Sequence, residues 1–335
     1  MKKSSFLALC AAAALAVIPL SQAQAKTYRV IFGGYFGPDH PNTAMMEHFK
    51  NELEEISNGQ FKVTLKPNNE AGGEEKIMEL CKRGTIQIAQ VGGLLKYDEP
   101  MIAAWEQPFV INSWEHARNV FLSGGMKPFE GQYTEKSGAR IAGIIVNGFR
   151  QISCNYPIKN MEDLGRMKIR TPLNDVFVEL FKALGTNPTP LPATELYTAL
   201  ETKVVDGQDN PYSMFKSMGW YEVNKYVLES RHIFSPTFVI VNDKFYQRLD
   251  EQAKQWFDTA MDNAIKYNWE LSEKDEADTV EFLKSHGVEI TVPSPEFKAQ
   301  MVKASEPVWA WFDKEVPGSK EIRDYCASVD PASAK

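Results

Sequence analysis

The segment from Gln247 to Ser285 contains neither proline nor glycine and predicts one nearly continuous helix. Such a helix far exceeds the mean length of about 11–12 residues in globular proteins. Because it would extend beyond a single lobe of ordinary size, we expect it to brace two lobes of one chain. No internal repeat or low-complexity linker occurs elsewhere, which leaves ordinary strands to join the lobes as hinges.

Short apolar runs alternate with helical patterns through most of the rest of the chain. Asn42 or Thr43 is expected to cap the first helix, Gly59 to follow its end, and Gly84 to end the second helix. Strands are expected at residues 28–32, 61–65, 86–91, 141–146 and 236–242, and helices at about 43–56 and 74–83. This alternation indicates the α/β class, with sheets flanked by helices.

The first 25 residues have the layout of a secretory signal peptide. Lys2 and Lys3 form a basic start, residues 6–20 are almost continuously apolar, and an A-x-A-like site ends at Ala25. The apolar run is too short and wrongly flanked for a membrane span, and Cys10 is poorly placed for a lipid anchor. We expect cleavage after Ala25, which leaves 335 − 25 = 310 residues of secreted protein, enough for two lobes.

The charge of the mature chain excludes several classes of partner. Removing Lys2 and Lys3 shifts the formal net charge from −7 to −9, and no basic run occurs, so nucleic acid and anionic membranes are poor partners. The five histidines are scattered and no CxxC pair exists, which argues against a metal site. Cys81, Cys154 and Cys326 are too few for a disulfide framework, although any two of them could still pair.

Three segments in the middle of the chain carry the functional signal. They are Asn147–Gln151 (NGFRQ), Met167–Pro172 (MKIRTP), and a third that runs from Pro188-Thr189-Pro190 to Val205–Pro211 (VDGQDNP). In order and spacing they closely resemble the DctP-type periplasmic receptors of tripartite ATP-independent periplasmic (TRAP) transporters. The resemblance extends over essentially the whole mature chain and includes the Gly72-Gly73-Glu74 turn.

The resemblance implies a two-lobe venus-flytrap fold with hinge strands near Asn147 and Ser235. The first lobe would comprise residues 26–147 and about 236–275, and the second residues 148–235 and about 276–329. The resemblance also implies a monomeric periplasmic receptor without enzymatic activity or cofactor. Such a receptor captures a small organic anion and hands it to the membrane subunits, which use an ion gradient for uptake.

The same resemblance implies that Arg170 clamps the carboxylate of the ligand while Arg150 and Asn210 assist. Pro172 holds the residue after Arg170 extended, and a guanidinium fork binds an oxyanion through two parallel hydrogen bonds. Each of the three residues has a structural alternative. Arg170 could form an internal salt bridge with a carboxylate such as Asp209, and Arg150 could brace the hinge. Asn210 could bond its own backbone in an Asn-Pro turn.

The loop after the first strand is expected to line the cleft, together with Gln90. The loop contains Tyr35, Phe36, Asp39 and His40, and either aromatic residue could cover the ligand or belong to the core. Gln90 falls where the family places a ligand-facing polar residue. Because Gln90 is neutral and the two arginines have no acid nearby, the pocket is expected to lack a partner for an amino group.

One departure from the family concerns Ala193, because many members carry an aromatic residue in this segment. Either the pocket is wider at Ala193, or a neighbour such as Phe149, Tyr212 or Phe215 fills the space. A dicarboxylate specificity therefore does not transfer directly. The candidate ligands are C4-dicarboxylates, hydroxy or keto acids and short sulfonates such as isethionate, with an aromatic or amino-acid-derived carboxylate as the alternative.

The rival class is an α/β enzyme, and the sequence gives it little support. Phe32–Gly37 is glycine-rich after a strand but does not spell GxGxxG. No nucleophile elbow or phosphate-binding loop occurs, and Asp39 and His40 are adjacent in a turn, where two side chains rarely converge on one atom. Turnover of a substrate, instead of stoichiometric binding, would favour the enzyme.

Overall fold

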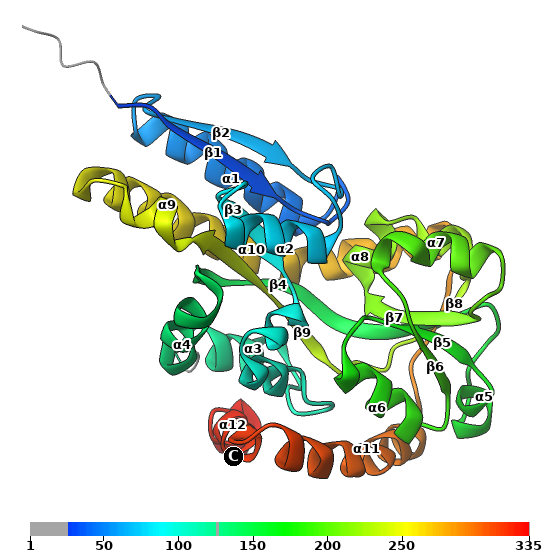
Figure 1. Ribbon diagram of the computed structural model, residues 1–335. Helices are drawn as coiled ribbons and strands as arrows, with labels where there is room; N and C mark the ends of the chain where they lie inside the picture. Colours follow the sequence, from blue (N-terminus) through cyan, green and yellow to red (C-terminus); the bar gives the residue numbers. More distant parts are fainter. Residues whose placement is uncertain (1–25, 125–126, 335) are drawn as a thin grey trace, which may run out of the picture.

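The computed structural model describes residues 26–124 and 127–334 (Figure 1). The predicted signal peptide, with its cleavage after Ala25, lies outside the described residues. Within these two ranges no helix is long and apolar enough to cross a bilayer. Cys81, Cys154 and Cys326 are buried free thiols, so none of them forms a disulfide.

The strands form one hydrogen-bonded array in the order β2-β1-β3-β9-β4-β7-β5-β6, and β8 pairs with β4 and β10 beside this path. The first sheet contains β1 (Tyr28–Gly33), β2 (Phe61–Lys66), β3 (Ile88–Val91), β9 (Phe234–Asn242) and the start of β4 (Ala139–Cys154). The second contains the end of β4 with β5 (Lys168–Thr171), β6 (Asn187–Pro190), β7 (Gly207–Pro211), β8 (Tyr226–Leu228) and β10 (Glu289–Thr291). We call the part built on each sheet the first lobe and the second lobe. The predicted α/β class and the five predicted strands are confirmed.

β4 joins the two sheets. Its residues 139–149 pair antiparallel with β9, and its residues 150–154 pair antiparallel with β7. The pairing with β9 shifts register between Val146 and Gly148, and Gly148 has a φ of +118°, which residues with a Cβ rarely adopt. This irregularity lies at Asn147, where the sequence predicts a hinge.

Helices cover the first sheet on both faces. They are α1 (Pro41–Ile56), α2 (Glu74–Arg83), α3 (Trp114–Phe121), α4 (Lys127–Ser137) and α9 (Asp243–Gln247), with the short helices η1 (Gly93–Tyr97) and η2 (Pro100–Glu106). The predicted cap of α1 is wrong. His40 caps it, with Nδ1 accepting from the Asn42 backbone N at 3.0 Å, because Pro41 occupies the first helical position that proline favours. Gly84 ends α2 in the left-handed conformation, as predicted.

The second lobe has shorter helices, which are α5 (Met161–Gly165), α6 (Asp175–Ala183), α7 (Ala193–Glu201), α8 (Tyr212–Ser217) and η3 (Trp220–Glu222). Asn174 caps α6 by accepting a hydrogen bond from the Val176 backbone N at 3.2 Å. This cap fixes the Asn174 side chain at the edge of the second lobe that faces the first.

The predicted long helix is α10 (Glu251–Ser285), which runs along both lobes (Figure 1). It packs on α1 and β4 in the first lobe and on α8 in the second. Asn268 Oδ1 accepts from the Val146 backbone N at 2.7 Å, and Trp269 Nε1 donates to the Ile144 carbonyl at 2.9 Å. The brace is therefore hydrogen-bonded to β4 immediately before the crossover between sheets.

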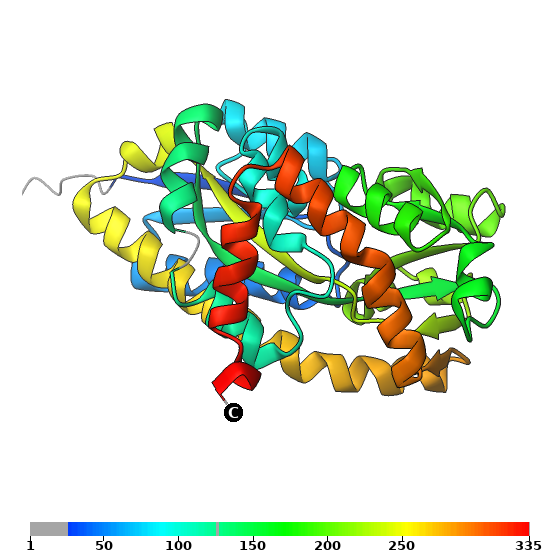
Figure 2. The same cartoon turned by 90° about the horizontal axis from the view of Figure 1, so that it is seen from below.

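The C-terminal helices pass beneath both lobes (Figure 2). They are α11 (Pro295–Glu315), α12 (Ser319–Ser328) and the short η4 (Pro331–Ala334). α11 packs against α5 and α6 of the second lobe, whereas α12 packs against η2 and α3 of the first. The expected division gave residues 276–329 to the second lobe, and the contacts of α12 depart from it. The other lobe boundaries stay a prediction.

Candidate functional site

A cavity lies between the two lobes and consists of an inner and an outer chamber. Tyr35, Glu74, Leu94, Arg170, Pro172 and Ala193 line both chambers. The inner chamber is also lined by Gly92, Gly93, Glu106, Asn147, Arg150, Asn174, Phe177, Asn210, Met214 and Ser235. The volumes are about 50 Å³ and 200 Å³, so the inner chamber alone holds little more than a water molecule or two. A six-carbon acid would need both chambers.

The exposed Lys76 lines the outer chamber only, and the unpaired positive charge of the inner chamber comes from Arg170. β5 carries it, and its Nε donates to the Leu191 carbonyl at 2.9 Å. Among the described residues no carboxylate lies within ion-pair distance of its guanidinium, so the predicted alternative of an internal salt bridge is not realised. Burial lowers the pKa of Arg170 to about 10, which still leaves the group charged at neutral pH. Within the described part of the chain this buried cation has no counter-ion of its own.

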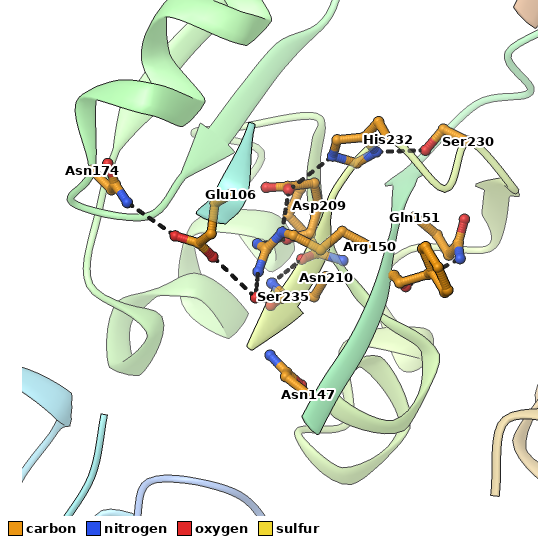
Figure 3. Close-up of polar contacts among 12 residues, drawn as sticks. Glu106, Asn147, Arg150, Gln151, Asn174, Asp209, Asn210, Ser230, His232 and Ser235 are labelled. Carbon is orange, nitrogen blue, oxygen red and sulfur yellow. Dashed lines mark hydrogen bonds and ion pairs between the residues drawn. The ribbon is translucent and has the colours of Figure 1, made fainter. Parts of the chain in front are cut away.

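Arg150, in contrast, is paired within the protein. Its Nε lies 2.5 Å from Asp209 Oδ2, and another guanidinium nitrogen donates to the Asp209 carbonyl (Figure 3). Its guanidinium carbon lies 4.6 Å from the Phe177 ring centre. Its last nitrogen is 3.5 Å from Ser235 Oγ. The charge of Arg150 is therefore balanced by Asp209, although its edge still lines the inner chamber.

A buried histidine supports this ion pair from behind. His232 Nε2 is 3.1 Å from Asp209 Oδ2, and His232 Nδ1 is 2.7 Å from Ser230 Oγ (Figure 3). Burial lowers the pKa of His232, so the ring is neutral at neutral pH. Because an ionised Asp209 only accepts hydrogen bonds, Nε2 carries the proton and Nδ1 accepts from Ser230. Burial alone would raise the pKa of Asp209, but Arg150 and His232 hold it well below its usual range.

Two carboxyl groups line the inner chamber without any ion-pair partner among the described residues. Glu106, at the end of η2, accepts from Ser235 Oγ at 3.2 Å and from Asn174 Nδ2 at 3.3 Å (Figure 3). Glu74, at the start of α2, accepts from the Gly92 backbone N at 2.6 Å. Burial raises the pKa of each to about 7. The expectation of a pocket without a nearby acid is therefore wrong.

Two amide side chains complete the inner chamber. Asn210 donates to Gln208 Oε1 at 2.6 Å instead of bonding its own backbone. Asn147 contacts Met214 Sδ through its Nδ2 at 3.7 Å. Burial lowers the pKa of the neighbouring His40, and a side-chain hydrogen bond with Asn147 partly offsets this lowering.

Five of the ten predicted site residues line the cavity, and five do not. Arg170, Arg150, Asn210, Tyr35 and Ala193 line the cavity. The other five predicted residues do not line it: Phe36 and His40 stack together in the core, Asp39 is exposed, Gln90 donates to the Asn42 carbonyl at 2.7 Å, and Tyr212 borders a separate small cavity behind the crossover. Of this loop only Tyr35 lines the cavity, whereas Phe36, His40 and Gln90 support its wall from behind.

Sequence reasoning missed several lining residues, namely Glu74, Glu106, Asn147, Asn174, Phe177, Met214 and Ser235. Glu74 and Asn147 were visible in the quoted motifs, at a Gly-Gly turn and beside the predicted hinge. Glu106 lies in a stretch for which periodicity predicted no element, and the structure makes it the end of η2. No local signal marked it, because its position depends on how η2 packs between the lobes.

Polar contacts cross between the lobes at the cavity and at its rim, and they close the cleft. Glu106 meets Asn174 inside the cavity, as described above. At the rim, Lys96 Nζ lies 3.1 Å from Asp175 Oδ2, and the Tyr97 hydroxyl donates to the Leu173 carbonyl at 2.8 Å. These contacts join η1 and η2 of the first lobe to the start of α6 in the second, so the structure represents a closed arrangement.

Glu106→Gln is expected to change how stability depends on pH. The pKa of Glu106 is about 7 when folded and about 4.5 as a free side chain, so its ionisation destabilises the fold increasingly as pH rises from about 4.5 to 7. The difference in free energy of unfolding between the glutamine variant and wild type should therefore be about 2 kcal/mol more in favour of the variant at pH 8 than at pH 5.5. Urea unfolding at both pH values measures this; the exposed Glu55→Gln is the control. An equal difference at both pH values would contradict the burial of a titrating Glu106.

Ala193→Phe is expected to weaken ligand binding. Ala193 begins α7 and lines both chambers, and Phe149, Tyr212 and Phe215 do not line them, so none of these rings has filled the space beside it. A phenyl ring there would overlap the ligand and cost about 1–3 kcal/mol of affinity. Calorimetry on the variant tests this, with Ala193→Ser as the control of minimal volume. Unchanged affinity and melting temperature would show that position 193 faces solvent.

Comparison with known proteins gives a consistent match. Residues 32–315 match the family described as bacterial extracellular solute-binding protein, family 7. A TRAP periplasmic solute-binding protein from Haemophilus influenzae, solved with bound L-gulonate, is 34% identical with a TM-score of 0.86, over 90% of this chain and 99% of that one. The galactonate complex of a sugar acid binding protein from Advenella mimigardefordensis is 26% identical with a TM-score of 0.88, over 91% and 99%. The sialic acid-binding periplasmic protein of Vibrio cholerae is 28% identical over 90% of this chain and 94% of its own length.

Proposed function

Since this chain belongs to the DctP family of solute-binding proteins from TRAP transporters, we propose that it captures a small organic acid in the periplasm and delivers it to the membrane subunits. The proposal includes secretion by a signal peptide that is cleaved after Ala25. The match covers residues 32–315, which include every residue that lines the cavity. Relatives bound to L-gulonate and galactonate support an organic acid as the ligand class.

The uncompensated guanidinium of Arg170 is the observation that carries the proposal. It is buried at the wall of an interlobe cavity, it has no carboxylate partner among the described residues, and it stays charged at neutral pH. A buried cation of this kind needs an anion, and a carboxylate fits the fork with two parallel hydrogen bonds. Arg150 and Asn210 then supply further donors from β4 and β7.

The binding assay is calorimetry with a panel of organic acids and their uncharged counterparts. We expect one or more acids among L-gulonate, D-galactonate, N-acetylneuraminate and succinate to bind with 1:1 stoichiometry and a Kd of about 10 µM or tighter. The neutral alditols that correspond to the two sugar acids should not bind at the same concentrations. If no acid binds, or if an alditol binds as well as its acid, the proposal is wrong.

Ligand should also close the cleft in solution. Among the described contacts at the cavity and its rim, Lys96–Asp175 is the one ion pair, and its carboxylate is largely exposed, so these contacts hold the empty protein closed only weakly. A ligand that touches both lobes stabilises the closed form alone and shifts the population toward it. Small-angle scattering should show a smaller radius of gyration with ligand, and Arg170→Ala should show no change. An unchanged wild-type profile at saturation would contradict ligand-driven closure.

A further inference from the structure

We propose that the cavity selects a monocarboxylate whose far end carries hydrogen-bond donors, hydroxyl or ammonium groups, and that it rejects a second anionic group. The inference rests on the proposed function and narrows its ligand class. It depends on the charges that line the inner chamber and on where the unused acceptors lie.

The charges of the inner chamber leave room for one ligand carboxylate. Asp209 balances Arg150 at 2.5 Å, which leaves Arg170 as the cation without a partner. Glu74 and Glu106 face the same space, and neither has an ion-pair partner among the described residues. The inner chamber therefore offers one unpaired cation, Arg170, to one ligand carboxylate. The other unpaired ionisable groups that line it, Glu74 and Glu106, are acidic.

A second ligand anion would meet this acidic wall. Glu106 is buried and Glu74 is half-buried, burial raises the pKa of each to about 7, and at pH 8 both are mainly ionised. The charged groups that act on them are Arg150, Arg170, Asp209, Lys96 and each other, and of these Lys96 is paired with Asp175 at the rim. No free cation remains among the described residues that line the inner chamber to offset a second carboxylate, phosphate or sulfonate there; Lys76 lines only the outer chamber, where it is exposed to solvent.

The same wall is rich in acceptors that need donors. One carboxylate oxygen of Glu74 accepts from the Gly92 backbone N, and its other oxygen has no hydrogen-bond partner among the described residues. Glu106 has only the long contacts at 3.2 and 3.3 Å. A carboxylate accepts up to about four hydrogen bonds, so these two side chains can receive several hydroxyl or ammonium donors.

The test compares acids that differ only at the far end. L-gulonate and D-glucarate share their stereocentres, and the second has a carboxylate where the first has a hydroxymethyl group; D-galactonate and galactarate form the same kind of pair. Hexanoate lacks the donors. 6-Aminohexanoate, compared with hexanoate, shows whether an ammonium group at the far end is accepted. Calorimetry at pH 8 gives the affinities of wild type, Glu74→Gln and Glu106→Gln.

At pH 8 we expect the monocarboxylate of at least one pair to bind about 100-fold more tightly than its dicarboxylate, and hexanoate to bind as poorly as the dicarboxylate. Glu106→Gln or Glu74→Gln should reduce the preference for the monocarboxylate about tenfold. Lowering the pH to 5.5 should reduce the preference of wild type for the monocarboxylate, because both glutamates then carry protons.

The inference is overturned if a dicarboxylate binds wild type within about threefold of its monocarboxylate partner at pH 8. It is also overturned if both glutamine variants keep the full preference, or if hexanoate binds as tightly as the sugar acids. In each of these cases acids still bind, so the proposed function stands. Binding of no acid at all would instead remove the proposed function, and the selectivity with it.

Discussion

Arg170→Ala is expected to lower affinity for the ligand by about 2–5 kcal/mol, or roughly 30-fold to several thousand-fold, while the protein stays folded. The substitution removes the only lining guanidinium among the described residues that no carboxylate balances. Its loss leaves the ligand carboxylate buried without a partner, which is the costly half of a broken ion pair. The empty protein should not lose stability, because burial already disfavours the charge of Arg170 and lowers its pKa to about 10.

Calorimetry and thermal unfolding together test this prediction. Arg170→Lys should also bind poorly, because an ammonium group offers a point charge in place of the fork. Arg166→Ala is the matched control, since Arg166 lies on the same lobe with an exposed side chain and pairs with Asp163. Binding by Arg170→Ala within about threefold of wild type would refute the assignment of Arg170 as the anion anchor.

Asp209→Ala is expected to destabilise the protein by about 3–5 kcal/mol. The side chain of Asp209 is fully buried and accepts from both Arg150 and His232. Its removal leaves the Arg150 cation buried without its partner and takes away the acceptor of His232. The melting temperature should fall by about 10 °C, given the usual relation between stability and melting temperature for a chain of this size.

A double variant shows whether the cost comes from the unpaired charge. Arg150→Met with Asp209→Ala removes both members of the pair and should recover part of the stability lost in Asp209→Ala alone. Urea unfolding of the two single variants and the double variant gives the coupling energy. A loss below about 1 kcal/mol in Asp209→Ala would mean that the ion pair does not hold β4 to β7.

The sequence predicted the elements whose signal is local. A segment without proline or glycine predicted α10, alternating or continuous apolar runs predicted the strands, and Gly84 marked the end of α2. The cap of α1 was missed because histidine is an uncommon capping residue, and only the structure shows Nδ1 of His40 in that role. Local chemistry therefore predicted the elements better than their ends.

The motifs predicted part of the site, and most lining residues outside them were not predicted. Arg170, Arg150, Asn210, Tyr35 and Ala193 line the cavity, but which arginine is free depends on strand register. The antiparallel pairing of β4 with β7 places Asp209 opposite Ile152 and beside Arg150, and nothing local in the sequence fixes that pairing. The balance of charge in the cavity is a property of packing, which explains why the acids were missed.

The place of β9 in the first sheet has a consequence for the order in which the chain can fold. β9 lies between β3 and β4, yet it comprises residues 234–242 of 335. As the chain emerges from a ribosome or an export channel, the first sheet lacks a central strand until most of the polypeptide is free. Pairing over such a long separation in sequence is slow to form. The topology itself therefore delays completion of the first sheet until most of the polypeptide is available.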